Sequence, residues 1–145
     1  MASEPPITPG YAEFRRLARR GNRIPVFREI LADLETPVSA FLKMASHEPS
    51  SFLLESVEHG EKIGRYSFMG CAPSQVLVGN GRDDLTRQIE GVMKKKKAVP
   101  LKGMPAFCGG WVGYLGYECV RHFESVRFRG KPGLEIPESV FFLVD

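Results

Sequence analysis

Residues Ser51–Gly70 constrain the fold more than any other stretch of this chain. The stretch begins with the apolar run Phe52–Leu54, passes through Glu55 and Ser56 into a charged turn, and ends in a second apolar run, Tyr66–Gly70. Two such runs joined by a short polar turn predict a β-hairpin. The first strand ends in a carboxylate beside a hydroxyl, and a polar strand end of this kind is either a solvated edge or part of a binding site.

Three further segments predict amphipathic helices, because each combines a capping residue with apolar residues at helical spacing. Thr36 caps the clearest of them, with Pro37 at the first helical position and an apolar stripe that continues to Ala45. The other two are expected from Thr8 to Gly21, with Pro9 at the first position, and from Asp83 or Asp84 to Val92.

Further strands are expected at Arg23–Leu31, Gln75–Val78 and Val140–Val144. The segment Phe107–Tyr117 is the most unusual, because it contains four glycines and both of its strand faces are apolar. A strand that is apolar on both faces is expected at the centre of a sheet. Glycines inside a strand mark places where another backbone or a ligand comes close, and the spacing favours close packing between two sheets over a ligand contact.

Length and composition indicate one globular domain, since 43% of the 145 residues are hydrophobic. A net charge of +3 is too mild to indicate a nucleic-acid-binding protein. The Pro-rich residues 1–10 are expected to be mobile, and they lack the pattern of a signal peptide. No run approaches the roughly 20 apolar residues of a membrane span, so a cytoplasmic location is expected. The three cysteines are far apart and indicate neither disulfides nor a metal site.

Catalytic motifs are missing from the sequence: it contains no HExxH, GxSxG or P-loop pattern, and no spaced cysteine and histidine set. The chain also stops directly after the apolar run Val140–Val144, which predicts that it is part of a longer protein. The residues alone therefore predict a mixed α/β domain with one candidate polar site, at Glu55 and Ser56.

Four segments, in order along the chain, resemble the N-terminal region of anthranilate synthase component I. They are TPVSAFLKMA (Thr36–Ala45), SFLLESVEHGEKIGRYSFMG (Ser51–Gly70), GGWVGYLGYECVRHFE (Gly109–Glu124) and IPESVFFLVD (Ile136–Asp145). Aminodeoxychorismate synthase component I shares this architecture. The uninterrupted LLES at Leu53–Ser56, followed by GRYSF, favours the anthranilate branch.

The resemblance implies an α+β fold of layered antiparallel or mixed β-sheets with outer helices, completed by strands from a C-terminal region. Residues 11–145 would form the regulatory region of an enzyme that converts chorismate, with ammonia from glutamine, into anthranilate and pyruvate. In that family chorismate and Mg²⁺ bind to the C-terminal catalytic domain, so no catalytic or metal-binding residue is assigned to this chain. The expected partner is a glutamine amidotransferase subunit, component II.

The same resemblance assigns a feedback site for L-tryptophan to the LLES motif, with Ser56 as the first contact, followed by Glu55 and Leu54. The chemistry suits an amino acid, because a carboxylate can accept from its ammonium, a hydroxyl can donate to its carboxylate and a leucine can contact its indole. Two alternatives stay open: the aminodeoxychorismate branch of the folate pathway, and a stand-alone amino-acid-binding module without catalysis.

Overall fold

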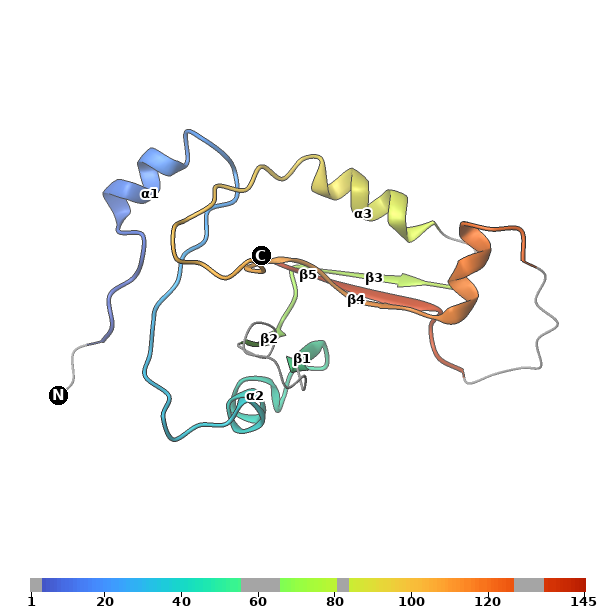
Figure 1. Ribbon diagram of the computed structural model, residues 1–145, viewed down its shortest axis with the longest axis horizontal. Helices are drawn as coiled ribbons and strands as arrows, with labels where there is room; N and C mark the ends of the chain where they lie inside the picture. The colour runs from blue at the N-terminus through green and yellow to red at the C-terminus, as the bar shows by residue number, and fades with distance from the viewer. Residues whose placement is uncertain (1–3, 56–65, 81–83, 127–134) are drawn as a thin grey trace.

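The computed structural model describes residues 4–55, 66–80, 84–126 and 135–145, and these form two antiparallel sheets with helices outside them (Figure 1). This confirms the α+β class. The elements in chain order are α1 (Tyr11–Leu17), α2 (Pro37–Ala45), β1 (Ser51–Glu55), β2 (Ser67–Cys71), β3 (Gln75–Gly79), α3 (Leu85–Met93), β4 (Gly110–Leu115), the 3₁₀ helix η1 (Tyr117–His122) and β5 (Ser139–Val144).

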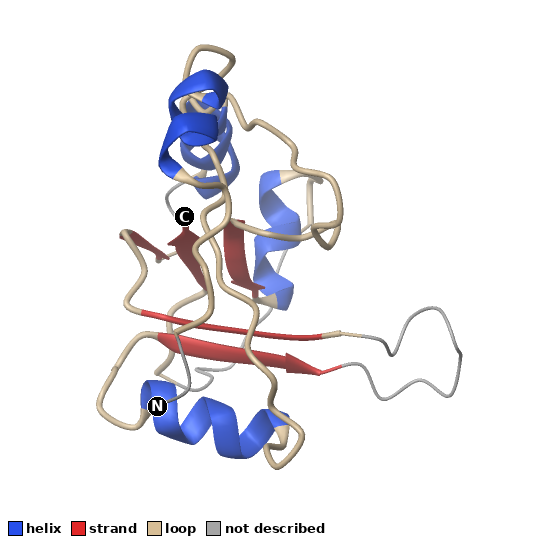
Figure 2. Ribbon diagram, turned by 90° about the vertical axis from the view of Figure 1, so that its left-hand side faces the viewer, coloured by secondary structure: helices blue, strands red, loops and turns tan. Residues whose placement is uncertain are grey.

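The predicted hairpin is confirmed. Strand β1 pairs with β2 in a register that places Ser51 opposite Cys71 and Glu55 opposite Ser67, while the turn between the strands lies outside the described residues. Helix α2 begins as the sequence predicts: Pro37 is its first residue, and the Thr36 side chain accepts from the Ser39 amide in a capping box. Figure 2 shows α2 lying along the hairpin, on the side away from the larger sheet.

The larger sheet has the order β3-β5-β4, and both pairings are antiparallel. The prediction that Phe107–Tyr117 forms the central strand is therefore wrong, because β4 lies at an edge and its second half is exposed. The central strand is β5, whose Leu143 and Ser139 are buried. The apolar pattern of β4 indicates that residues pack against both faces of the strand. It does not indicate whether the strand lies at the centre or at the edge of the sheet, because that depends on which strands pair with it.

Two predictions at the N-terminal end are also wrong. Residues 23–31 form no strand; they make isolated bridges, from Arg23 to Ala98 and from Phe27 to Thr8. Thr8 is occupied by this bridge, through two main-chain hydrogen bonds of 2.9 and 2.8 Å, so it does not cap a helix. Helix α1 begins at Tyr11 instead, with Gly10 as its N-cap. A run of apolar residues without a neighbouring strand does not form a ladder.

The arrangement is open. Helix α3 covers one face of the larger sheet, and the strands of the hairpin cross below its other face (Figures 1 and 2). The accessible surface is 11992 Å², against about 7,500 Å² for a compact monomer of this mass. On the face opposite α3, the side chains of Val76, Val78 and Tyr114 are exposed. The fold therefore leaves apolar sheet surface uncovered.

Candidate functional site

The candidate site lies at the end of β1. Leu54 and Glu55 are the last two residues of this strand, opposite Phe68 and Ser67 of β2, and both are exposed. Ser56, the first contact that the sequence predicts, lies outside the described residues. Two of the three predicted site residues are thus placed by the structure, at an accessible strand end.

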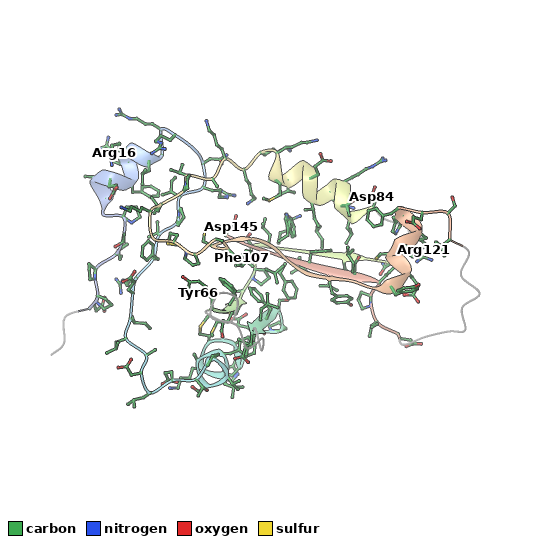
Figure 3. All side chains as sticks on the ribbon, viewed as in Figure 1. Arg16, Tyr66, Asp84, Phe107, Arg121 and Asp145 are labelled. Carbon is green, nitrogen blue, oxygen red and sulfur yellow. The ribbon has the colours of Figure 1, made fainter. Side chains whose placement is uncertain are left out.

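Leu54 and Glu55 point to opposite faces of the hairpin, because successive side chains of a strand alternate. Leu54 shares its face with Phe68, and the Phe68 ring makes an edge-to-face contact with Phe107, the centroids being 5.4 Å apart. Phe107 precedes β4, so this face is turned toward the larger sheet, as Figure 3 shows for the labelled Phe107. The structure brings Leu54, but not Glu55, to the aromatic side of the hairpin.

Three aromatic residues on this side contact one another in sequence, Tyr66 to Phe68 and Phe68 to Phe107, and they are called the aromatic group here. The rings of Tyr66 and Phe68 are 5.9 Å apart and tilted by 35°. The sequence does not reveal the group as a unit, since Phe107 follows Phe68 by almost 40 residues and no local spacing joins them. Such a group offers both ring faces and ring edges to an apolar or aromatic ligand.

Close contact between the two strands keeps the hairpin in this register. Phe52 and Gly70 are opposite each other, and the Phe52 ring lies over Gly70. A Cβ atom on Gly70 would be 2.6 Å from that ring, so any larger residue would displace Phe52. Leu54 is two residues further along the same face, and its position depends on this packing.

Glu55 is chemically available. Among the described residues no hydrogen bond or ion pair engages its carboxylate, and the strand end leaves it open to solvent. A carboxylate is an acceptor only, and it makes its strongest hydrogen bonds with cations such as an ammonium group. The site can therefore combine an apolar contact at Leu54 with an anionic acceptor at the next residue.

Elsewhere, an apolar hollow of about 170 Å³ lies at the end of β5, where Met93, Cys108 and Val144 contribute to its wall. Asp145 lies at its rim, and hydrogen bonds from Lys96 above all hold the pKa of that carboxyl below its usual range. The hollow is smaller than the roughly 300–1,000 Å³ of typical ligand pockets, and its charged residues already form ion pairs with one another, since Arg23 and Lys96 both pair with Asp145.

Metal binding and membrane insertion find no support in the residues that the structure describes. These residues hold no group of three or more histidine, cysteine or acidic side chains that could bind a metal ion. None of their helices is long and apolar enough to cross a membrane.

The fold and site define an α+β domain whose hairpin presents a polar strand end beside an aromatic group. The chain is 39% identical over 142 residues to the probable anthranilate synthase component 1 of Schizosaccharomyces pombe, 44% over 133 residues to anthranilate synthase component 1 of Synechocystis, and 42% over 153 residues to that of Pseudomonas putida. The matches cover 96%, 81% and 92% of this chain. No family model matches it.

The chain is therefore homologous to part of anthranilate synthase component 1. It spans 29%, 26% and 31% of the length of these three relatives, which is less than a third of each. The resemblance that the LLES and GGWVGYLGY segments indicate is confirmed by identity along nearly the whole chain.

Proposed function

We propose that this chain is the N-terminal, tryptophan-sensing part of an anthranilate synthase component 1. The observation that carries the proposal is the identity of about 40% over nearly the whole chain to relatives of that name. The complete protein would convert chorismate and ammonia into anthranilate and pyruvate, with the ammonia supplied from glutamine by a component II amidotransferase. This reaction belongs to tryptophan biosynthesis, and we propose that the complete enzyme is cytoplasmic.

In this proposal the chemistry belongs to the part of the protein outside this chain, where chorismate and Mg²⁺ would bind. The open architecture supports the idea that this chain packs against that part of the protein. Val76 and Val78 on β3 and Tyr114 on β4 expose apolar side chains on one sheet face. Burying such a face yields about 25 cal/mol for each Å² removed from water, so the remainder of the protein would cover it.

Tryptophan would bind across the end of β1. Its indole ring would contact Leu54 and the aromatic group, its ammonium would donate to the carboxylate of Glu55, and the Ser56 hydroxyl would donate to its carboxylate. Since Leu54 and Glu55 point to opposite faces, the ligand has to bridge the strand end rather than lie on one face. The other wall of the pocket would come from the rest of the protein.

Calorimetric titration of the complete protein with L-tryptophan tests this site. Replacing Ser56 by Ala, or Leu54 by Ala, removes a charge-assisted hydrogen bond or an apolar contact, and we expect affinity to fall about tenfold or more. Leu31→Ala is the matched control, because Leu31 is 87% exposed and lies outside the hairpin. Its affinity should equal that of the unmodified protein.

Two readouts separate the parts of the proposal. Unchanged tryptophan affinity in both the Ser56 and Leu54 variants would refute the proposed tryptophan site, even if the protein still converts chorismate. Conversely, formation of aminodeoxychorismate instead of anthranilate would overturn the enzymatic assignment, whatever happens to tryptophan binding.

A further inference from the structure

Two basic segments that are far apart in the sequence lie side by side in the fold. Asn22 joins them: its side-chain amide donates to the Lys95 carbonyl at 2.8 Å, and its side-chain oxygen accepts from the Lys97 amide at 2.6 Å. The main-chain amides of Asn22 and Arg23 both donate to the Lys97 carbonyl, at 3.0 and 3.1 Å. Figure 1 shows the segments that follow α1 and α3 meeting here.

Close backbone contact fixes this junction. A Cβ atom on Gly21 would be 2.3 Å from the Lys97 carbonyl oxygen, so the two segments approach as closely as a glycine allows. Val99 completes the junction by donating to the Arg23 carbonyl at 2.8 Å, and its side chain is buried. Hydrogen bonds from the main chain and from the Asn22 side chain therefore hold the two cationic segments together.

Four exposed cations lie at the junction, and we call them the basic surface: Arg19, Arg20, Lys95 and Lys97. Three further basic residues on the two helices or next to them have local contacts: Arg16 pairs with Glu13, Lys94 pairs with Glu90, and Arg15 lies over the Tyr11 ring. The four cations of the basic surface make no ion pair with any described residue.

Helix dipoles do not account for this arrangement. The basic residues after α1 and after α3 each stabilise the C-terminal end of their own helix through its dipole. That benefit is local to each helix, and it gives no reason to bring the two groups together, where like charges repel. Uncompensated cations held side by side by other forces are typical of a surface that meets an anionic partner.

Two shallow hollows lie between the segments, of about 250 and 400 Å³, and Arg20 and Lys97 line both. A guanidinium and an ammonium beside one hollow suit a carboxylate, which can accept from both. An exposed apolar residue lies close to the cations in the chain, since Met93 at the end of α3 is exposed and is followed two residues later by Lys95. Arginine and methionine are enriched at protein interfaces.

We propose that the basic surface binds an acidic patch on a partner protein, whose aspartate or glutamate side chains enter the hollows between Arg20 and Lys97. The surface is distinct from the end of β1, and the inference does not depend on tryptophan binding. A protein fits better than a nucleic acid because the rest of the chain adds no basic excess: 16 of its 20 basic residues and all 17 acidic residues lie outside the basic surface.

Fluorescence anisotropy with the complete protein tests this, using a labelled oligo-glutamate peptide and an oligodeoxynucleotide of equal charge. The double variant Arg20→Glu/Lys97→Glu should weaken peptide binding about tenfold or more. The double variant Arg28→Glu/Arg87→Glu is the control, because it changes net charge equally at exposed positions outside the basic surface. Its effect should stay within about twofold, and binding of the unmodified protein should weaken as salt is added.

A milder double variant, Arg19→Gln/Lys95→Gln, removes charge without reversing it and should give an intermediate loss of peptide affinity. It keeps the test decisive if the first variant does not fold, which circular dichroism will show. Equal losses in the Arg20/Lys97 and Arg28/Arg87 variants, or no peptide binding by the unmodified protein, would overturn the proposal. Tighter binding of the oligodeoxynucleotide than of the peptide would replace the acidic protein by a nucleic acid.

Discussion

Gly113 on β4 offers the sharpest test of how the larger sheet is held together. It lies opposite Phe141 of β5, and a Cβ atom added there would be 1.9 Å from the Val140 carbonyl oxygen and 2.7 Å from the Phe141 Cα. Ordinary contact begins near 3.4 Å, so β4 would have to shift by about 1.5 Å. Both clashing atoms belong to the backbone, which cannot rotate aside as a side chain does.

The expected cost of Gly113→Ala follows from that shift. Overpacking alone costs about 1–3 kcal/mol, and each ladder hydrogen bond that the shift breaks adds about 0.5–1.5 kcal/mol. We therefore expect the free energy of unfolding to fall by at least about 3 kcal/mol, a large share of the 5–15 kcal/mol that holds a typical domain.

Urea titration followed by the emission of Trp111 measures this loss. Trp111 is the single tryptophan of the chain and lies two residues from Gly113 in β4. Gly91→Ala is the control: it lies within α3, and a Cβ atom there meets nothing within 4 Å. Alanine should stabilise that helix by about 1 kcal/mol. A loss below about 1 kcal/mol for Gly113→Ala would refute the backbone clash as the reason for this glycine.

Two further predictions concern titratable groups. Burial raises the pKa of the Cys119 thiol, whereas Cys108 is exposed. A thiol reagent at neutral pH should therefore modify Cys108 rapidly and Cys119 only as the chain unfolds. Mass spectrometry after timed quenching measures the two rates, and equal rates would contradict the burial of Cys119. The Thr86 hydroxyl, and then the Arg87 amide, hold the pKa of the Asp84 carboxyl below its usual range. Because the folded pKa is the lower one, the ionised cap of α3 contributes stability above the usual aspartate range and loses it as pH falls through the folded value. Circular dichroism should show an acid-induced loss of helix that Asp84→Asn reduces.

Local signals in the sequence predict the parts of the fold that local contacts form. The Thr36 capping box, Pro37 and the apolar stripe define α2 without reference to other segments. The hairpin follows equally well, because its strands are joined by one turn. By contrast, the apolar faces of Phe107–Tyr117 indicate burial but not which strand lies beside it, and its partner β5 is more than 20 residues away. The prediction of strand pairing is limited by the distance between the two strands along the sequence, and not by a weak hydrophobic pattern.

The same limit applies to the candidate site. The LLES motif predicts Ser56, Glu55 and Leu54 as site residues from one continuous stretch, whereas Phe107 comes from a distant segment and is brought to Leu54's face of the hairpin by tertiary packing. The edge-to-face contact between Phe68 and Phe107 joins the hairpin to the segment that precedes β4. A pair of this kind adds about 0.5–1.5 kcal/mol beyond its burial, which is small beside the energy of either sheet.

Under the proposed function, the contact between the hairpin and the segment before β4 offers a way for a ligand at the strand end to act on the rest of the protein. The hairpin and α2 pack closely on each other, since both β1 and β2 contact the helix. The short link from Cys71 to Gln75 joins the hairpin to β3, Ser74 in this link donates to the Leu143 carbonyl, and Phe68 contacts Phe107 just before β4. A ligand can shift an equilibrium only by its difference in affinity for two arrangements. A ligand that binds beside Leu54, on the face that carries Phe68, would favour one orientation of the hairpin over another by its own difference in affinity for the two orientations.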